Sequence, residues 1–153
     1  MNWSVIHNPA YWGEKRLNYP NVPKEHAKFS ESVVVENLIF VSGCIGKDAQ
    51  TNKAIPKSIA DQTYLALENT RLALDRAGSS MENIVKTFSL IRDLSEYGEY
   101  RKAETEYYEE YAPTLIKKPP SATLMVYPGL ALPELKMEYE VIAIINRDAK
   151  DWN

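Results

Sequence analysis

Cysteine and histidine are scarce in this 153-residue chain, which carries one cysteine, Cys44, and two histidines, His7 and His26. A single cysteine excludes an intramolecular disulfide, and the sequence has neither a CxxC pair nor the Cys/His spacing of a zinc site. Both histidines precede residue 29, so the pattern does not support a Ser-His-Asp triad. We therefore expect no Cys/His zinc site and a reducing, cytoplasmic compartment.

An excess of positive charge and long apolar runs are also missing. Lys and Arg total 18 against 21 Asp and Glu, which gives a net charge of -3 and a pI near 5.5. Because such a charge does not attract a phosphate backbone, nucleic-acid binding is not expected. No run is long enough to cross a bilayer, and the N-terminus lacks a signal-peptide core, so neither a membrane partner nor secretion is expected.

The first 28 residues are interpreted as an irregular extension, because Pro9, Pro20 and Pro23 interrupt every periodicity there. This segment also contains four aromatic residues, which is too apolar for a solvated tail, and we expect it to pack on the body. A chain of this length forms one core. The predicted domain is therefore residues 29–147, followed by a short tail at 148–153.

Alternating strand and helix patterns follow from residue 33 onward. A Glu36-Asn37 turn between two apolar runs predicts a hairpin, on whose second strand two-residue alternation puts Phe40, Ser42 and Cys44 on one face. The predicted order is ββαβαββ, with strands at residues 33–35, 38–45, 84–91, 121–127 and 136–145 and helices at 58–77 and 95–112. Two helices cover one face of such a sheet, so subunit association is expected to bury the other face.

Tyrosines and acidic residues crowd the second predicted helix, residues 95–112. Tyrosines can stack on nucleic-acid bases, but the neighbouring carboxylates would repel phosphates. We interpret the aromatic face as core and the acidic face as solvated.

Several short segments, taken in order, resemble the Rid family (YjgF-type, reactive intermediate deaminase), also described as the endoribonuclease L-PSP family. The matching segments are residues 39–43, 62, 66–69, 77–78, 84–87, 93–94 and 137–144. This resemblance implies a chorismate-mutase-like α+β fold and a homotrimer whose sheets line a central β-barrel, with a cleft at each subunit interface. It also implies hydrolysis of enamines and imines to a 2-oxo acid and ammonia, without a metal or organic cofactor.

The substrate-binding pattern of the family is altered in this chain. The family's arginine, which clamps the substrate carboxylate with a bidentate fork, falls on Pro120, directly before Ser121. Under one hypothesis, the nearby cations Lys117 and Lys118 replace the arginine as point charges. The family's cleft tyrosine falls on Phe29, which keeps the ring and loses the hydroxyl.

Serine and glycine of the family's cleft wall are retained as Ser42 and Gly43, and the position after them is Cys44. Glu138 matches the glutamate that positions the attacking water, and desolvation in an apolar cleft would raise the pKa of such a carboxyl. Cys44 is a candidate nucleophile, although a lone cysteine is more often a small buried hydrophobe.

Three functions stay open at this point. The protein is a divergent hydrolase that deaminates an enamine, imine or related intermediate, with Glu138 directing water and Phe29 stacking. Alternatively, it is a trimer that binds a small ligand without turnover, or an enzyme of tautomerisation or ring opening that uses Cys44. The change from arginine to Pro120 predicts slow turnover of the substrates of arginine-bearing relatives.

Overall fold

A six-stranded sheet is the centre of the fold in the computed structural model, which describes residues 2–8, 29–51 and 53–145. The strands follow the spatial order β1-β2-β3-β6-β4-β5. Their bounds are β1 (Trp3–Ile6), β2 (Ser32–Val35), β3 (Leu38–Ile45), β4 (Ile84–Ile91), β5 (Ser121–Val126) and β6 (Met137–Ile144). The helices are α1 (Ile59–Arg76), α2 (Tyr97–Tyr111) and α3 (Pro113–Lys117), with 3₁₀ turns η1 (Met81–Asn83) and η2 (Leu94–Glu96).

The predicted mixed α+β order is confirmed, and its local causes are visible at the ends of α1. Ser58 caps the helix by accepting a 3.0 Å hydrogen bond from the Asp61 amide. At the other end, Gly78 adopts φ 77°, a left-handed conformation that glycine tolerates and most residues do not. The chain can therefore leave the helix sharply and enter η1 and β4.

Two parts of the sequence interpretation differ from the structure. Residues 3–6 of the presumed irregular extension form β1, which pairs antiparallel with β2. This strand was missed because the Trp3–Ile6 run is only four residues long and lies next to the proline-rich segment. The short helix α3, which begins at Pro113, was also missed. Residues 9–28 and the presumed tail at 148–153 lie outside the described residues.

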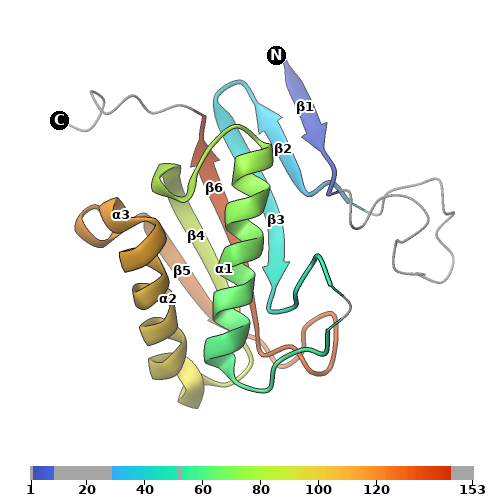
Figure 1. Cartoon of the computed structure of the whole chain (residues 1–153), viewed down its shortest axis with the longest axis vertical. Helices are drawn as coiled ribbons and strands as arrows, with labels where there is room; N and C mark the ends of the chain where they lie inside the picture. The colour runs from blue at the N-terminus through green and yellow to red at the C-terminus, as the bar shows by residue number, and fades with distance from the viewer. Residues whose placement is uncertain (1, 9–28, 52, 146–153) are drawn as a thin grey trace, which may run out of the picture.

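The core lies between the sheet and the helices α1 and α2, which both cover the same face of the sheet (Figure 1). Tyr100, Tyr107 and Tyr108 of α2 are buried there, which confirms the interpretation of this aromatic face as core. The predicted solvated acidic face is wrong for Glu104, which is only 2% exposed. Within the described ranges, no helix is long and apolar enough to cross a membrane.

Among the residues that the structure describes, no helix lies on the opposite face of the sheet (Figure 1). The strand pairing and the alternation of buried residues place its side chains: Phe40 faces Ile142, Phe88 faces Glu140, and Leu90 lies between Glu138 and Met125. Apolar side chains on this face remain accessible, with Phe40 exposed by 42% and Met125 by 50%. We call this surface the open sheet face.

A β-bulge interrupts β3 between Val41 and Cys44, where the register with β6 shifts. The bulge moves Cys44 to the helix-covered face, where it packs against the core, whereas Phe40 stays on the open sheet face. The expectation that Phe40, Ser42 and Cys44 share a face is therefore wrong. An extra residue in the strand inverts the alternation beyond it.

Candidate functional site

Glu138 and Gly43 form the centre of the candidate site on the open sheet face. The bulge on β3 brings Gly43 against the Glu138 side chain of β6, so closely that a β-carbon at position 43 would lie 1.8 Å from Glu138 Oε1. Only a residue without a side chain leaves the carboxylate in this place. Glycine at position 43 is thus required for this position of the Glu138 carboxylate.

A hollow of about 270 Å³ lies beside Glu138. Its lining is apolar apart from the carboxylate and the tyrosine, and consists of Leu90, Met125, Tyr127, Gly129, Leu130, Ala131 and Glu138. Four of these seven residues come from the loop that follows β5, which was not predicted to be part of the site. A carboxylate beside an apolar hollow of this size can act on a small organic molecule.

The environment of Glu138 favours its protonated form. Half-burial among apolar groups raises the pKa of this carboxyl, and the negative charge of Glu140 on the same face raises it further. A raised pKa brings a carboxyl closer to the operating pH at which general acids and bases are most effective. This arrangement makes Glu138 a candidate acid or base.

Ser42 and Phe29 lie at the same end of the sheet as Glu138. The Ser42 hydroxyl donates a 2.8 Å hydrogen bond to the carbonyl of Ser30, and the Ser42 amide donates to the carbonyl of Glu31. The Glu31 carboxylate in turn accepts two hydrogen bonds of 2.7 and 2.5 Å from Arg76 at the end of α1. These contacts fix the segment that carries Phe29, whose ring is 57% exposed.

Pro120, Ser121 and Lys118 lie at the other end. Ser121 pairs with Lys86 on β4, whereas Glu138 is level with Met125, four residues further along β5. At about 3.3 Å per strand residue, Ser121 and Glu138 are offset by roughly 13 Å along the strand direction within one chain. The predicted site residues therefore form two groups at opposite ends of the open sheet face.

Cys44 belongs to neither group. Its thiol donates a 3.5 Å hydrogen bond to the Ser42 carbonyl on the helix-covered side of the sheet. Burial raises the pKa of the Cys44 thiol to about 12, so the nucleophilic thiolate is suppressed at neutral pH. The structure thus places Cys44 apart from the other candidate site residues, where it packs against the core as a partly buried side chain.

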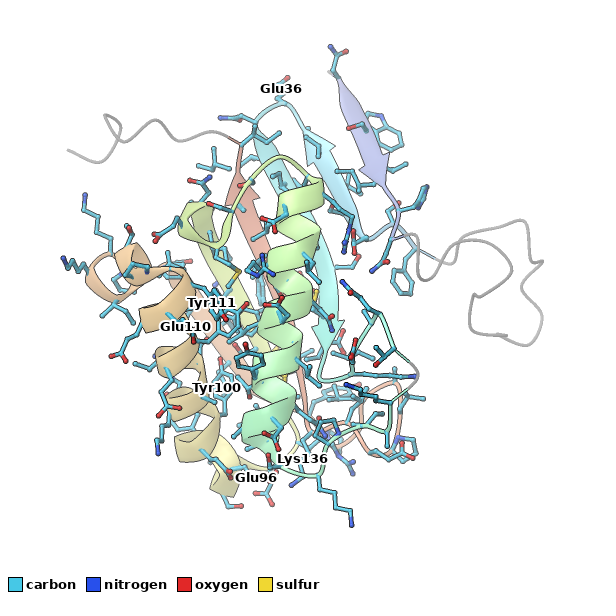
Figure 2. All side chains as sticks on the ribbon, in the orientation of Figure 1. Glu36, Glu96, Tyr100, Glu110, Tyr111 and Lys136 are labelled. Carbon is cyan, nitrogen blue, oxygen red and sulfur yellow. The ribbon has the colours of Figure 1, made fainter. Side chains whose placement is uncertain are left out.

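A second hollow, polar in character, lies next to the start of α2. It is lined by Arg92, Asp93, Glu96, Pro128 and Lys136. Lys136 donates a hydrogen bond to Glu96, and Figure 2 shows these two side chains together at the end of the helix layer. Two of the charges that line this hollow, those of Lys136 and Glu96, are therefore already paired. In the part of the chain that the structure describes, no group of three His, Cys, Asp or Glu residues could hold a metal ion.

The layered fold and the carboxylate on its open sheet face define a class of small α+β proteins, and comparison identifies the family. The family model described as Endoribonuclease L-PSP matches residues 20–145. The chain therefore belongs to this family, which is the Rid/YjgF family that the sequence motifs indicate.

Relatives of known structure share the fold. The YjgF gene product of E. coli superposes with a TM-score of 0.73 at 21% identity, covering 92% of this chain and 98% of that chain. E. coli TdcF with bound serine gives a TM-score of 0.74 at 24% identity, covering 94% and 99%. The predicted fold is thereby confirmed.

Two relatives are named as deaminases. The 2-iminobutanoate/2-iminopropanoate deaminase of Rattus norvegicus is 28% identical over 131 residues, which are 85% of this chain and 89% of the relative. Reactive Intermediate Deaminase A, chloroplastic, of Arabidopsis thaliana is 32% identical over 124 residues, which are 80% of this chain and 62% of the relative.

Proposed function

We propose that this protein hydrolyses small imines or enamines to carbonyl compounds and ammonia, without a cofactor, in clefts between the subunits of a homotrimer. The observation that carries the proposal is the half-buried Glu138 carboxyl, which has a raised pKa and lies beside an apolar hollow on the open sheet face. The deaminase names of two relatives and the serine bound to a third protein of the same fold support a small amino-acid-derived substrate.

Subunit association accounts for the division of the site into two groups. Glu138, Gly43 and Phe29 lie at one end of the open sheet face, and Pro120 and Ser121 at the other. In a cleft between two copies, the ends from different chains meet, and the exposed apolar face becomes buried. Association therefore serves both the stability of the sheet and the completion of the site.

Glu138 supplies the proton transfers in the proposed reaction. The oxygen of a water molecule bonds to the imine carbon, the electron pair of the carbon–nitrogen π bond moves to the nitrogen, and one water proton passes to the Glu138 carboxylate. Glu138 returns this proton to the nitrogen, which gives a neutral carbinolamine. Glu138 then takes the hydroxyl proton of the carbinolamine and passes it to the amine, so that the carbon–nitrogen bond breaks, ammonia leaves and the carbonyl product forms. No electrons are exchanged, so the reaction needs no redox partner.

The test is an assay for ammonia and 2-oxo acid with 2-aminoacrylate or 2-iminopropanoate generated in the reaction vessel. Wild-type protein is expected to accelerate hydrolysis, and Glu138→Gln is expected to lower kcat/KM by about a hundredfold or more, because general acid–base catalysis contributes roughly that much. The matched control is Glu106→Gln on the solvated side of α2, where the side chain is 63% exposed. Equal rates for wild type and Glu138→Gln would refute the role of Glu138.

Pro120 favours a second function, a trimer that binds a small ligand in the same cleft without turnover. A proline at the position of the family's arginine removes the charge and the hydrogen-bond donors that orient a substrate carboxylate. In that case, ligands raise the unfolding temperature while the imine assay shows no acceleration. The two measurements together separate the functions.

A further inference from the structure

Lys86 of β4 points its ammonium group along the open sheet face. Its Nζ donates a 2.7 Å hydrogen bond to Thr123 Oγ1 of β5 and lies 4.6 Å from the centroid of the Phe88 ring. In the parallel pairing of β4 with β5, Lys86 is the partner of Ser121. The half-buried cation is therefore directly beside the residue that follows Pro120.

The charge of Lys86 lacks an acidic partner among the described residues. Among the described residues, ion pairs join Arg76 to Glu31 and Lys136 to Glu96, and Lys86 takes part in none. Its contacts are a hydroxyl and an aromatic ring. Taking an ammonium partly out of water without an anion has a free-energy cost, which a bound anion would offset.

The donors around Lys86 suit a carboxylate. An ammonium group has three protons, and only one is engaged by Thr123. Because the Thr123 hydroxyl accepts from Lys86, its own proton is available to a further acceptor. The hydroxyl of Ser121, on the exposed first residue of β5, lies on the same face.

We propose that Lys86, with the hydroxyls of Thr123 and Ser121, binds the carboxylate of a 2-imino acid substrate and takes over the role of the arginine that Pro120 displaces. This inference rests on the proposed function for the identity of the ligand. Lysine is a point charge without the planar fork of arginine, so it holds the carboxylate with less control of orientation. Slow turnover with retained carboxylate binding follows from this difference.

Binding of a stable product analogue tests the inference without relying on turnover. The probes are 2-oxobutanoate and butanone, which have the same ethyl ketone skeleton and differ by a carboxylate in place of a methyl group. Ligand-observed NMR titration is expected to show that wild-type protein binds 2-oxobutanoate at least about tenfold more tightly than butanone, and that Lys86→Met removes this preference, since a hydrogen bond to a charged group contributes about that much. Lys86→Arg is expected to retain it.

The matched control is Lys102→Met, the same change on the outer side of α2 at a side chain that is 76% exposed. Its affinity for 2-oxobutanoate should equal that of wild type. Thermal unfolding checks that Lys86→Met is folded; Lys86→Gln replaces it if it is not, and the comparison of the two probes on wild type requires no variant.

The outcomes separate this inference from the proposed function. If Lys86→Met binds 2-oxobutanoate as tightly as wild type, or wild type shows no preference for it, the inference is overturned, whatever the imine assay gives. If carboxylate binding depends on Lys86 while wild type hydrolyses no imine, the binding site stands and the deaminase proposal fails.

Discussion

Gly43 shows how a single residue without a side chain sets the position of a reactive group. Glu138 fills the space that a β-carbon at position 43 would occupy, with Oε1 only 1.8 Å from that point. The clash involves the far end of a flexible side chain, so the fold can survive it while the carboxylate moves. A methyl group at this position therefore acts on the chemistry more than on the stability.

Gly43→Ala is expected to lower kcat/KM for imine hydrolysis by at least about tenfold, because a displacement of the base by an ångström or more disrupts the proton-transfer geometry. Its unfolding temperature should change little. Gly98→Ala is the matched control, since a β-carbon there meets no atom within 4 Å and the residue lies within α2. That change should leave activity intact and stabilise the helix by about 0.5–1 kcal/mol. Full activity in Gly43→Ala would contradict the assignment of Glu138 as the base.

The charge of Glu140 contributes to the raised pKa of Glu138. Desolvation raises the pKa of Glu138, and the charge of Glu140 raises it further. A base works only when ionised, so activity should fall as the pH drops through this raised pKa. Glu140→Gln removes the second cause, and the acid limb of the kcat/KM profile is expected to shift to lower pH. An unchanged limb would show that the group titrating in the profile is not Glu138.

The raised pKa of Glu138 also affects stability. The pH dependence of stability runs opposite to that of activity. Because the folded pKa of Glu138 exceeds its unfolded value, the folded state binds the proton more tightly. The contribution of this group to the free energy of unfolding is therefore present below the unfolded pKa and decreases as the pH rises through the folded pKa.

The residues of the site could be predicted only where the local sequence determines on which face of the sheet they lie. Glu138 lies on a regular strand, and its alternation with buried Met137 and Tyr139 places it correctly on the open face. Cys44 was misplaced because no composition signal marks the bulge between Val41 and Cys44; the bulge depends on how β3 meets β6. Lys86 was overlooked because its importance arises from pairing with Ser121, which is 35 positions away in the sequence.

Helices and strands are determined partly by the sequence pattern and partly by tertiary contacts. Helix α2 illustrates the role of tertiary contacts. The carboxylate Oε1 of buried Glu104 accepts 2.8 Å hydrogen bonds from the hydroxyls of Tyr100 and Tyr139, and its Oε2 accepts from Arg101. Tyr100 also shares a 2.7 Å hydrogen bond with Ser89 of β4. Figure 2 shows Tyr100 in the layer between α2 and α1. This network connects the helix to two strands of the sheet.

Replacing Glu104 by leucine is expected to lower the free energy of unfolding by about 2–4 kcal/mol, because two buried hydroxyls lose their acceptor. Glutamine keeps an acceptor oxygen and should cost about half as much. Urea unfolding measures both effects. Glu106→Leu on the exposed side of the same helix should change stability by less than about 0.5 kcal/mol. A small effect of Glu104→Leu would show that packing alone docks α2.

Helices and strands were predictable where the apolar period was long enough to be distinctive. The stripe on α1 and the eight-residue strands β3, β4 and β6 carry many turns or alternations each. The four-residue β1 and the five-residue α3 carry too few, and neighbouring strands or helices decide their conformation. Burial of Glu104 was unpredictable for a related reason, since its partners come from other elements.

At the scale of the whole molecule, the open sheet face is an apolar surface that remains exposed in the single chain. Phe40, Phe88, Leu90, Met125 and Ile142 share it, and none of the helices in the described ranges covers them. Contiguous apolar surface of this kind is typical of an interface, and a threefold arrangement of identical sheets buries it in every copy. The same association would bring Glu138 of one subunit toward Lys86 of another, so assembly and activity depend on one another.

Phe40→Glu tests this dependence directly. Phe40 is 42% exposed in the single chain and central on the open sheet face, so a buried charge there should prevent association. Light scattering is expected to give about 52 kDa for wild type, three times the 17.4 kDa of one chain, and a single-chain mass for the variant. Leu94→Glu is the matched control, because Leu94 is 63% exposed in η2 and lies outside the open face. That variant should remain trimeric and active, whereas Phe40→Glu should lose imine hydrolysis together with its assembly. A wild-type mass of 17.4 kDa would remove the cleft, and with it the meeting of Glu138 and Lys86 on which turnover depends.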